Sequence, residues 1–431
     1  MTDPVSRRTF MGTSAAAAAA FAFPSGVFTQ GSSVMRVGLV GCGGRGSGAA
    51  RDCLTGSSGV ELVAMGDLVP DRLASSRAEL AKLAASNPAV ARGYKVTDDR
   101  AFTGFDAYQK VLQSNVDLVI LATPPGFRPA HLAAAVAAGK HIFTEKPVAV
   151  DSGGIRSVLA TYEIAKQKNL AIVAGTQRRH EAKYVATLDR IHTGAIGDVM
   201  SGQVFWNQGS LWSREKNAAW SDGEWQIRNW LYFAWLSGDH IVEQHVHNLD
   251  VANWVLKAHP IRAVGMGGRQ SRVEQPRFGH IYDHFAIDYE YPSGARVTSM
   301  CRQIAGTRGR IGESFIGTKG RSNTHNGEIL GSAAWKFSSA GKPVDPYVQE
   351  HTDLVASIRK GQPLNELKTV AESTLTAIMG REAAYTGQEL TWDEVLNADQ
   401  VLAPPDVGFV TLPLPPVPMP GKTKLARKWN E

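Results

Sequence analysis

The sequence predicts an α/β protein built from two domains. Three observations lead to this prediction: a length of 431 residues, short apolar runs that alternate with helical runs in the first half, and strand-like polar and apolar alternation later on. At roughly 100–200 residues per domain, this length fits two domains, or three at most. Hydrophobic residues make up 43% of the chain and charged residues 20%, which is enough apolar material for large cores and too little charge for disorder.

Residues 1–32 are expected to be a leader. Arg7 and Arg8 precede an alanine-dominated run over 15–23, which is too short to cross a bilayer and is typical of a signal peptide. The paired arginines resemble the twin-arginine signal, which addresses a folded protein to its own export machinery. An ordinary secretion signal stays open as an alternative. We expect cleavage near Ala22, the twin-arginine machinery as a partner, and a periplasmic or extracytoplasmic location.

Charge and cysteine content argue against several classes of protein. Lys plus Arg exceed Asp plus Glu by 46 to 40, and much of the net charge of +6 lies at the two ends of the chain. The body of the protein therefore has no basic stripe to bind nucleic acid. Cys42, Cys53 and Cys301 have no C-x-x-C spacing, which argues against a disulfide framework or a thiolate metal site. We also expect no membrane span, since no other run approaches about 18 apolar residues.

Residues 33–176 are expected to bind a dinucleotide. The apolar, strand-like run 34–40 leads directly into a G-x-G-x-x-G motif. Glycine is needed there because the chain must turn tightly and bring its backbone and a helix N-terminus against a pyrophosphate. A strand, this turn and a helix predict a Rossmann domain. The cofactor-binding residues expected in the turn are Gly41, Gly43, Gly44, Arg45 and Gly46.

The next strand-like run, 60–65, leads to a carboxylate at Asp67. A carboxylate at this distance from the glycine-rich turn accepts hydrogen bonds from the adenosine ribose, which favours NAD. Arg72 keeps NADP possible, because a guanidinium could neutralise a 2′-phosphate, and we assign Arg72 to the cofactor site as well. A helix cap before Pro70 is the alternative role for Asp67.

Two more strands are expected at 117–122 and 140–144, separated by an alanine-rich helical run. Strand, helix and strand in this order are typical of a parallel crossover. Ligands of open α/β sheets bind at the carboxyl ends of the strands. That rule assigns Thr123 and Pro124, after the first strand, and Glu145 and Lys146, after the second, to the cofactor site. A helix over 155–168 and a strand over 171–174 complete the domain.

These motifs together resemble the family of glucose-fructose oxidoreductase, inositol dehydrogenase and MocA. The resemblance covers roughly residues 34–395 and rests on the following stretches: the glycine-rich turn, Thr123-Pro124-Pro125 with His131 downstream, Glu145-Lys146-Pro147, and Gln177-Arg178-Arg179. It implies that residues 177–400 form an α/β domain whose open, mostly antiparallel sheet covers the nicotinamide. It also implies a sugar or cyclitol substrate and a homo-oligomer. His131 is assigned to the cofactor, and Arg178 and Arg179 to the substrate.

Residues 238–250 look like the second motif of this family, in which an acidic residue precedes a catalytic histidine by four positions. Here Glu243 stands where Asp is commoner, and His247 follows it at i+4, which predicts one shared helix face. A carboxylate beside an imidazole orients it and raises its pKa. In the implied mechanism, His247 takes the hydroxyl proton and Lys146 stabilises the oxygen while hydride leaves. The expected catalytic residues are Lys146, His247 and Glu243.

The same motif is rich in histidine. His240 and His245 join Glu243 and His247, but their spacing matches no strong zinc pattern, so no metal is predicted. We assign His245 to the substrate site.

Six tryptophans lie between Trp206 and Trp235, interleaved with polar residues. Tryptophan faces stack on sugar rings and also fill cores. We expect a lid over a polyol site, with Trp206 and Trp230 contacting substrate, and core packing is the alternative. Alternation over 284–291 and 296–300 predicts antiparallel strands. The proline-rich stretch 401–431 is expected to be an extended arm laid on a neighbouring surface.

Three functions are compatible with these residues. The favoured one is an NAD-dependent oxidoreductase acting on a hydroxyl of a sugar, glycoside or cyclitol. Because free NAD is scarce outside the cytoplasm, an exported enzyme would carry its cofactor tightly bound. The alternative is an NAD-dependent glycoside hydrolase that acts by transient oxidation and elimination and needs the same residues. A binding or sensor protein without turnover is the third.

Overall fold

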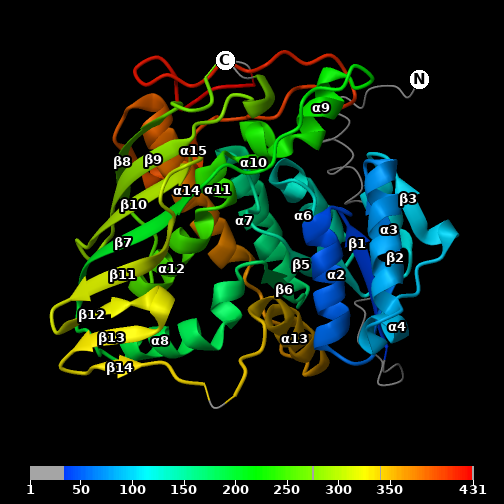
Figure 1. Cartoon of the computed structure of the whole chain (residues 1–431), viewed down its shortest axis with the longest axis horizontal. Helices are drawn as coiled ribbons and strands as arrows, with labels where there is room; N and C mark the ends of the chain where they lie inside the picture. The colour runs from blue at the N-terminus through cyan, green and yellow to red at the C-terminus, as the bar shows by residue number, and fades with distance from the viewer. Residues whose placement is uncertain (1–33, 274–275, 340, 430–431) are drawn as a thin grey trace.

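The fold contains two sheets, and each is covered by helices (Figure 1). It comes from a computed structural model that describes residues 34–273, 276–339 and 341–429. The expected leader, 1–32, lies outside these residues. The α/β fold class is confirmed, with a parallel sheet first and a mostly antiparallel sheet second.

The first sheet has six parallel strands in the order β3-β2-β1-β4-β5-β6. β1 and β4 are apolar along nearly their whole length and are buried, as expected for strands covered on both faces. The strands are β1 (Met35–Val40), β2 (Val60–Asp67), β3 (Ala101–Thr103), β4 (Leu118–Leu121), β5 (His141–Thr144) and β6 (Ile172–Ala174). The order reverses between β1 and β4, and the carboxyl ends there form the place where such sheets bind ligands.

Helices connect these strands and cover both faces of the sheet. Two of them begin at side-chain caps: Asn87 accepts from the N–H of Ala89, and Asp151 accepts from that of Gly154. The helices are α2 (Gly44–Gly56), α3 (Pro70–Ala84), α4 (Pro88–Gly93), α5 (Ala107–Gln113), α6 (Arg128–Ala137) and α7 (Ser152–Gln167), with short turns η2 (Asp98–Arg100) and η3 (Pro125–Phe127).

The second sheet has nine strands in the order β14-β13-β12-β11-β7-β10-β9-β8-β15. β7 and β10 run parallel, and the other neighbouring pairs run antiparallel. The strands are β7 (Val199–Gln208), β8 (Arg262–Gly268), β9 (His284–Glu290), β10 (Arg296–Gln303), β11 (Arg310–Gly317), β12 (Gly320–Asn323), β13 (Glu328–Gly331), β14 (Trp335–Lys336) and β15 (Leu390–Thr391). One face packs on helices, while Met200, Met266, Met300 and Ile316 are exposed on the sheet's strands.

The remaining helices lie between the sheets and at their ends. They are η4 (Gln177–His180), α8 (Ala182–His192), α9 (Asp222–Arg228), η5 (Trp230–Tyr232), α10 (Ala234–Ser237), α11 (His240–Glu243), α12 (Val246–Leu256), η6 (Pro276–Phe278), η7 (Thr324–Asn326), α13 (Pro346–Arg359), α14 (Leu367–Thr386) and α15 (Trp392–Asn397). No helix of the described residues is long and apolar enough to cross a membrane.

The late helices do not all stay with the second sheet. Leu354 and Ile358 of α13 pack in the hydrophobic core on one side of the first sheet, and Leu367 and Val370 of α14 pack in the core on the other side. The expected unit 177–400 therefore contributes to the cores of the dinucleotide domain as well as to its own.

The proline-rich arm lies on its own chain. In Figure 1 it crosses the top of the molecule from the second sheet towards α9. The Tyr282 hydroxyl donates to the carbonyl of Pro418 at 2.8 Å, and Arg427 is buried against Glu382 at 2.6 Å.

Candidate active site

The glycine-rich turn has the shape that a dinucleotide requires. Gly41 has a φ of +98°, and a Cβ added there would lie 2.6 Å from backbone atoms of residues 122 and 123. A Cβ on Gly46 would meet the carbonyl oxygen of Gly41 at 1.8 Å. By contrast, nothing lies within 4 Å of a Cβ built on Gly44. The turn is thus closed towards the protein and open on the side from which a ligand would approach.

The N-terminus of α2 faces this opening. Its cap residue, Gly43, offers no side-chain acceptor, and the first turn of the helix holds no acidic residue. The first backbone N–H groups therefore remain available to an anion, which fits the pyrophosphate of a dinucleotide.

Asp67 ends β2 beside the turn. Its two carboxylate oxygens accept from the N–H of Cys42 at 2.6 Å and from that of Val69 at 2.8 Å. Burial is the main cause that raises the pKa of Asp67 above its ordinary value. Arg72 lies close by, with its Nη1 3.7 Å from a Cβ built on Gly43. Asp67 and Arg72 both border the turn.

The stretch after β4 is held from beneath. His131 of α6 is bonded to the hydroxyl of Thr123 at 3.1 Å and stacks on Tyr108, with ring centroids 4.3 Å apart. Burial lowers the pKa of His131 to about 3, so the ring is neutral. Arg128, which the sequence analysis missed, donates to the carbonyls of Leu121 and Thr123. Arg128 thus holds the backbone of this stretch, and His131 holds the side chain of Thr123. Pro124 follows within the same stretch.

Lys146 follows β5 and reaches across to the second domain. Its ammonium donates to the backbone carbonyl of Glu243 at 2.6 Å and to the Glu243 carboxylate at 3.2 Å. Both side chains are largely buried, at 10% and 12% exposure. An ammonium has three N–H donors, so one remains for a substrate oxygen.

The structure corrects the expected pairing of Glu243 with His247. α11 ends at Glu243, residues 244 and 245 form a turn, and α12 starts at Val246, so the two side chains do not share one continuous helix. Asp239, with a φ of +73°, caps α11 through its side chain. The Glu243 carboxylate is bonded to Lys146 and not to the imidazole.

His247 consequently lacks the anionic neighbour that was expected to raise its pKa. Burial, followed by the positive charge of Lys146 and Arg178, lowers the pKa of His247 well below its ordinary value. Its Nδ1 has no hydrogen-bond partner among the described residues. A neutral imidazole near an ammonium is a competent proton acceptor.

Trp206 of β7 forms one wall beside His247. The two rings stack with centroids 5.7 Å apart and planes 25° apart. The guanidinium of Arg178 lies 5.5 Å from the Trp206 ring and is paired with Glu313 at 2.6 Å. Asn248 and Tyr184 also bond to Glu313. The sequence gives no sign of Glu313, because it lies 135 residues from Arg178 along the chain.

Arg45 and Glu145 lie at the junction of α2 and β5. The Arg45 guanidinium is bonded to Glu145, and its other nitrogen lies 3.3 Å from Glu350 of α13. Glu350 is fully buried, which raises its pKa well above the ordinary value. Arg45 therefore joins the glycine-rich turn to the EKP stretch, and its charge also acts on His247.

Three of the expected substrate residues make contacts within the protein itself. Arg179 forms a bidentate pair with the buried Asp250 at 2.8 to 3.1 Å and is a structural contact. His245 is fully buried and bonded to Ser299 of β10 at 2.8 Å, and burial lowers its pKa to about 3. Trp230 stacks edge-on against Trp212, with centroids 6.3 Å apart, in a segment that packs on the first domain.

The histidine-rich motif forms no cluster of ligands. Among the residues that the structure describes, no group of three or more His, Cys, Asp or Glu side chains could hold a metal ion. The three cysteines are buried and free.

Both domains of the chain match models of a known protein family. Residues 35–176 match the model of an oxidoreductase family with an NAD-binding Rossmann fold, GFO_IDH_MocA, and residues 184–322 match a C-terminal domain of the same family. The chain belongs to the GFO/IDH/MocA family. The Lys146 and His247 stretches thus come from the two domains that define this family.

Some of the relatives are named as dehydrogenases and others as glycosyl hydrolases. Inositol 2-dehydrogenase 4 of Saccharopolyspora erythraea is 29% identical over 61% of this chain and 65% of its own length. A glycosyl hydrolase family 109 protein of Streptomyces niveus is 30% identical over 42% of this chain. The chain spans 34% of that relative's length.

Solved structures share the fold. The scyllo-inositol dehydrogenase of Lactobacillus casei, with bound NAD(H) and scyllo-inositol, has a TM-score of 0.62 at 17% identity, covering 84% of this chain and 99% of its own. The aldose-aldose oxidoreductase of Caulobacter crescentus has a TM-score of 0.63 at 16% identity, covering 83% and 99%.

Proposed function

We propose that this protein oxidises a hydroxyl group of a sugar, glycoside or cyclitol and uses tightly held NAD as the hydride acceptor. The observation that carries the proposal is the meeting of Lys146 from the first domain with the Glu243–His247 stretch of the second. The names of the relatives, which act on inositol or aldoses, support the class of substrate.

Each residue at this meeting point has a distinct task. His247, held neutral by its surroundings, takes the proton of the reacting hydroxyl. The free N–H donor of Lys146 bonds to the same oxygen and stabilises the negative charge that develops on it. Glu243 holds the ammonium in place through its side chain and its backbone. NAD, when bound, supplies the acceptor for the hydride that leaves the carbon.

The residues around the turn would hold the cofactor. The open side of Gly43 and Gly44, with the N-terminus of α2, fits the pyrophosphate. Asp67 is positioned at the ribose end, and Arg72 beside it leaves NADP as the alternative cofactor. Trp206 offers an aromatic face beside His247, on which the C–H face of a sugar ring can pack.

A glycoside hydrolase acting through transient oxidation is the second candidate. The match to a glycosyl hydrolase family 109 protein favours it. Oxidation of a ring hydroxyl to a ketone makes the neighbouring C–H more acidic. Loss of that proton breaks the glycosidic bond by elimination, and the aglycone leaves. Water then adds to the double bond that the elimination leaves, and the hydride returns to the ketone, so that the net reaction is hydrolysis and NAD is unchanged overall.

Product analysis distinguishes the two. The purified protein is incubated with aryl glycosides and with free sugars and cyclitols, and products are followed by mass spectrometry together with nicotinamide absorbance. An oxidised sugar or NADH establishes the oxidoreductase. Release of the aglycone without net NADH establishes the hydrolase. Neither product from any member of both classes would contradict the proposal.

We also propose that the protein is exported folded by the twin-arginine route and works outside the cytoplasm as a homo-oligomer. Arg7 and Arg8 support the export route. The exposed apolar side chains of the second sheet, Met200 at 58%, Met266 at 73% and Ile316 at 56%, support an interface between subunits. Fractionation of cells with a variant carrying Lys at positions 7 and 8 tests the first part, and light scattering tests the second.

A further inference from the structure

The tryptophan-rich stretch 209–232, here called the lid segment, packs on the first domain. Its residues Trp225 and Leu231 belong to one hydrophobic cluster with Phe127, and Leu68 and Phe105 pack against that cluster. Leu68 directly follows β2, Phe105 follows β3, and Phe127 follows β4. The lid segment therefore lies over the carboxyl ends of the strands at the β2 side of the sheet.

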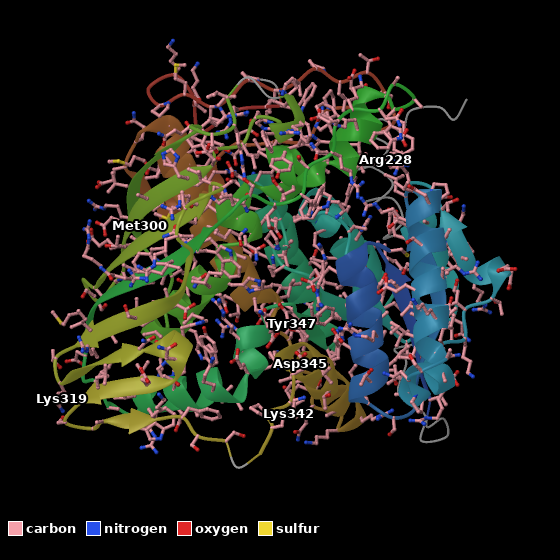
Figure 2. All side chains as sticks on the ribbon, viewed as in Figure 1. Arg228, Met300, Lys319, Lys342, Asp345 and Tyr347 are labelled. Carbon is pink, nitrogen blue, oxygen red and sulfur yellow. The ribbon has the colours of Figure 1, made fainter. Side chains whose placement is uncertain are left out.

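An ion pair tethers the lid segment to the same edge. Arg228, at the end of α9, lies 3.0 Å from Asp71 in the first turn of α3. Figure 2 labels Arg228 near the upper end of α3, between the two domains. Arg228 also bonds to Glu224 of its own helix at 2.8 Å and lies 4.8 Å from the ring of Trp220.

The proline-rich arm holds the lid segment from the other side. The N–H of Gly223 donates to the carbonyl of Val410 at 2.9 Å, and the amide of Gln226 donates to that of Pro413 at 3.2 Å. One residue before Val410, Phe409 stacks edge-on against Phe105 of the first domain, with ring centroids 5.6 Å apart. The arm thus bridges the lid segment and the dinucleotide domain.

Two arginines bring positive charge close to the glycine-rich turn. Arg72 borders the glycine-rich turn, and its guanidinium makes no hydrogen bond or ion pair within the part of the chain that the structure describes. Arg214 of the lid segment acts on it as a second positive charge, and together with burial this lowers the pKa of Arg72. The carboxylates of Asp67 and Asp71 act on Arg72 in the opposite sense, although neither is bonded to its guanidinium. Two neighbouring guanidinium groups of this kind suit a phosphate-bearing ligand.

We propose that the lid segment, clamped by the arm, closes over the adenosine half of the dinucleotide and retains it from one turnover to the next. Asp67, at the ribose end, lies one residue before Leu68, which the lid cluster covers. The inference rests on the proposed binding of NAD and assigns this stretch to the cofactor and not to the polyol. With the cofactor retained, the hydride and proton taken from one hydroxyl must return to a carbonyl group that enters the same site.

The rate at which the cofactor leaves tests this proposal. Protein loaded with NADH is mixed with an excess of NAD, and release is followed by the loss of bound nicotinamide fluorescence. Asp71→Asn removes the tether and Phe409→Ala removes the arm contact. Each should speed release about two- to fivefold, the scale of an exposed pair, and the double variant should speed it about tenfold.

A matched control removes an ion pair of the same kind elsewhere. Asp98→Asn breaks the ion pair between Arg77 and Asp98, which lie 2.6 Å apart. Both residues belong to the first domain, so this pair does not hold the lid segment, and its loss should leave the release rate unchanged. Asp71 and Phe409 are 68% and 41% exposed, so both variants should fold. Arg214→Gln, at another exposed position, should also speed release and provides an independent second variant.

The possible results distinguish a failure of the lid proposal from a failure of the proposed function. Equal release rates for the wild type, the double variant and Arg214→Gln, with NADH bound in each, would overturn the lid while leaving the proposed oxidoreductase intact. A wild type that binds neither NADH nor NADPH would overturn the proposed function and the lid together.

Discussion

Lys146 is the residue on which the proposed chemistry depends most directly. It touches Glu243 with two of its donors and leaves one for substrate. In the proposed chemistry, His247 is the proton acceptor. Their separation of about one hundred positions along the chain means that only the folded protein brings them together.

Lys146→Ala should lower kcat for hydride transfer by roughly 10²–10⁴ and leave NADH affinity nearly unchanged, because the ammonium acts on the reacting oxygen. Glu243→Gln retains the size of the side chain and the backbone contact, so its kcat should fall less, by about tenfold. Stopped-flow measurement of hydride transfer, paired with NADH fluorescence titration, gives both quantities. Near-normal turnover of Lys146→Ala would remove this lysine from the active site.

The pH dependence of oxidation should reflect the lowered pKa of His247. A group with a lowered pKa is already deprotonated at neutral pH, and it remains a base as the pH falls through the ordinary histidine range. We therefore expect kcat/KM to stay level from about pH 8 to about pH 6. A loss of kcat/KM with a midpoint at or above about 6.5 would show that His247 has a carboxylate partner after all.

At the scale of elements, the parallel sheet was the part most accessible to prediction. Its strands are short and mostly apolar, and the structure confirms a strand at each expected place. The short strand β3 was not predicted. The interruption between α11 and α12 was not accessible, because residues 240–250 read as one helical stretch. The pairs Arg178–Glu313 and Arg228–Asp71 were inaccessible for another reason: they join residues more than one hundred positions apart.

The turn between β1 and α2 offers a test of cofactor choice. Asp67→Ala removes the carboxylate at the ribose end, and with it the repulsion of a 2′-phosphate. NADH affinity should fall by about tenfold or more, whereas NADPH affinity should fall less or rise. Because Asp67 also accepts two backbone N–H groups, Asp67→Asn serves as the variant that retains the shape of the turn. An unchanged ratio of the two affinities in both variants would contradict the ribose assignment.

At the scale of the whole molecule, His180 joins segments that are distant in sequence. It follows the first sheet in η4 and lies 2.7 Å from Asp353 of α13 and 3.2 Å from Glu366, next to α14. Despite burial, these two carboxylates raise its pKa to about 9. His180 is therefore charged at neutral pH and fastens α13 and α14 to the end of the dinucleotide domain.

His180→Asn should reduce stability in a pH-dependent way. Because the pKa of His180 is higher in the folded protein than in the unfolded chain, its charged ring stabilises the folded state. This contribution is fully present below about pH 6.5 and is lost as the pH rises through about 9. The difference in thermal midpoint between wild type and variant should thus be largest near about pH 6 and should vanish near about pH 10. A difference that is constant over this range would mean that the ring contributes through packing alone.

The return of α13 and α14 to the first sheet also bears on how the protein is made. Leu354 and Leu367 complete the two cores of the dinucleotide domain, yet they follow the whole of the second sheet's main strands in the chain. During translation the nucleotide-binding half therefore stays incomplete until the ribosome has passed residue 371. We therefore expect stable cofactor binding only after residue 371 has been made. If the protein is exported folded, as we propose, it must acquire the dinucleotide after that point and before export.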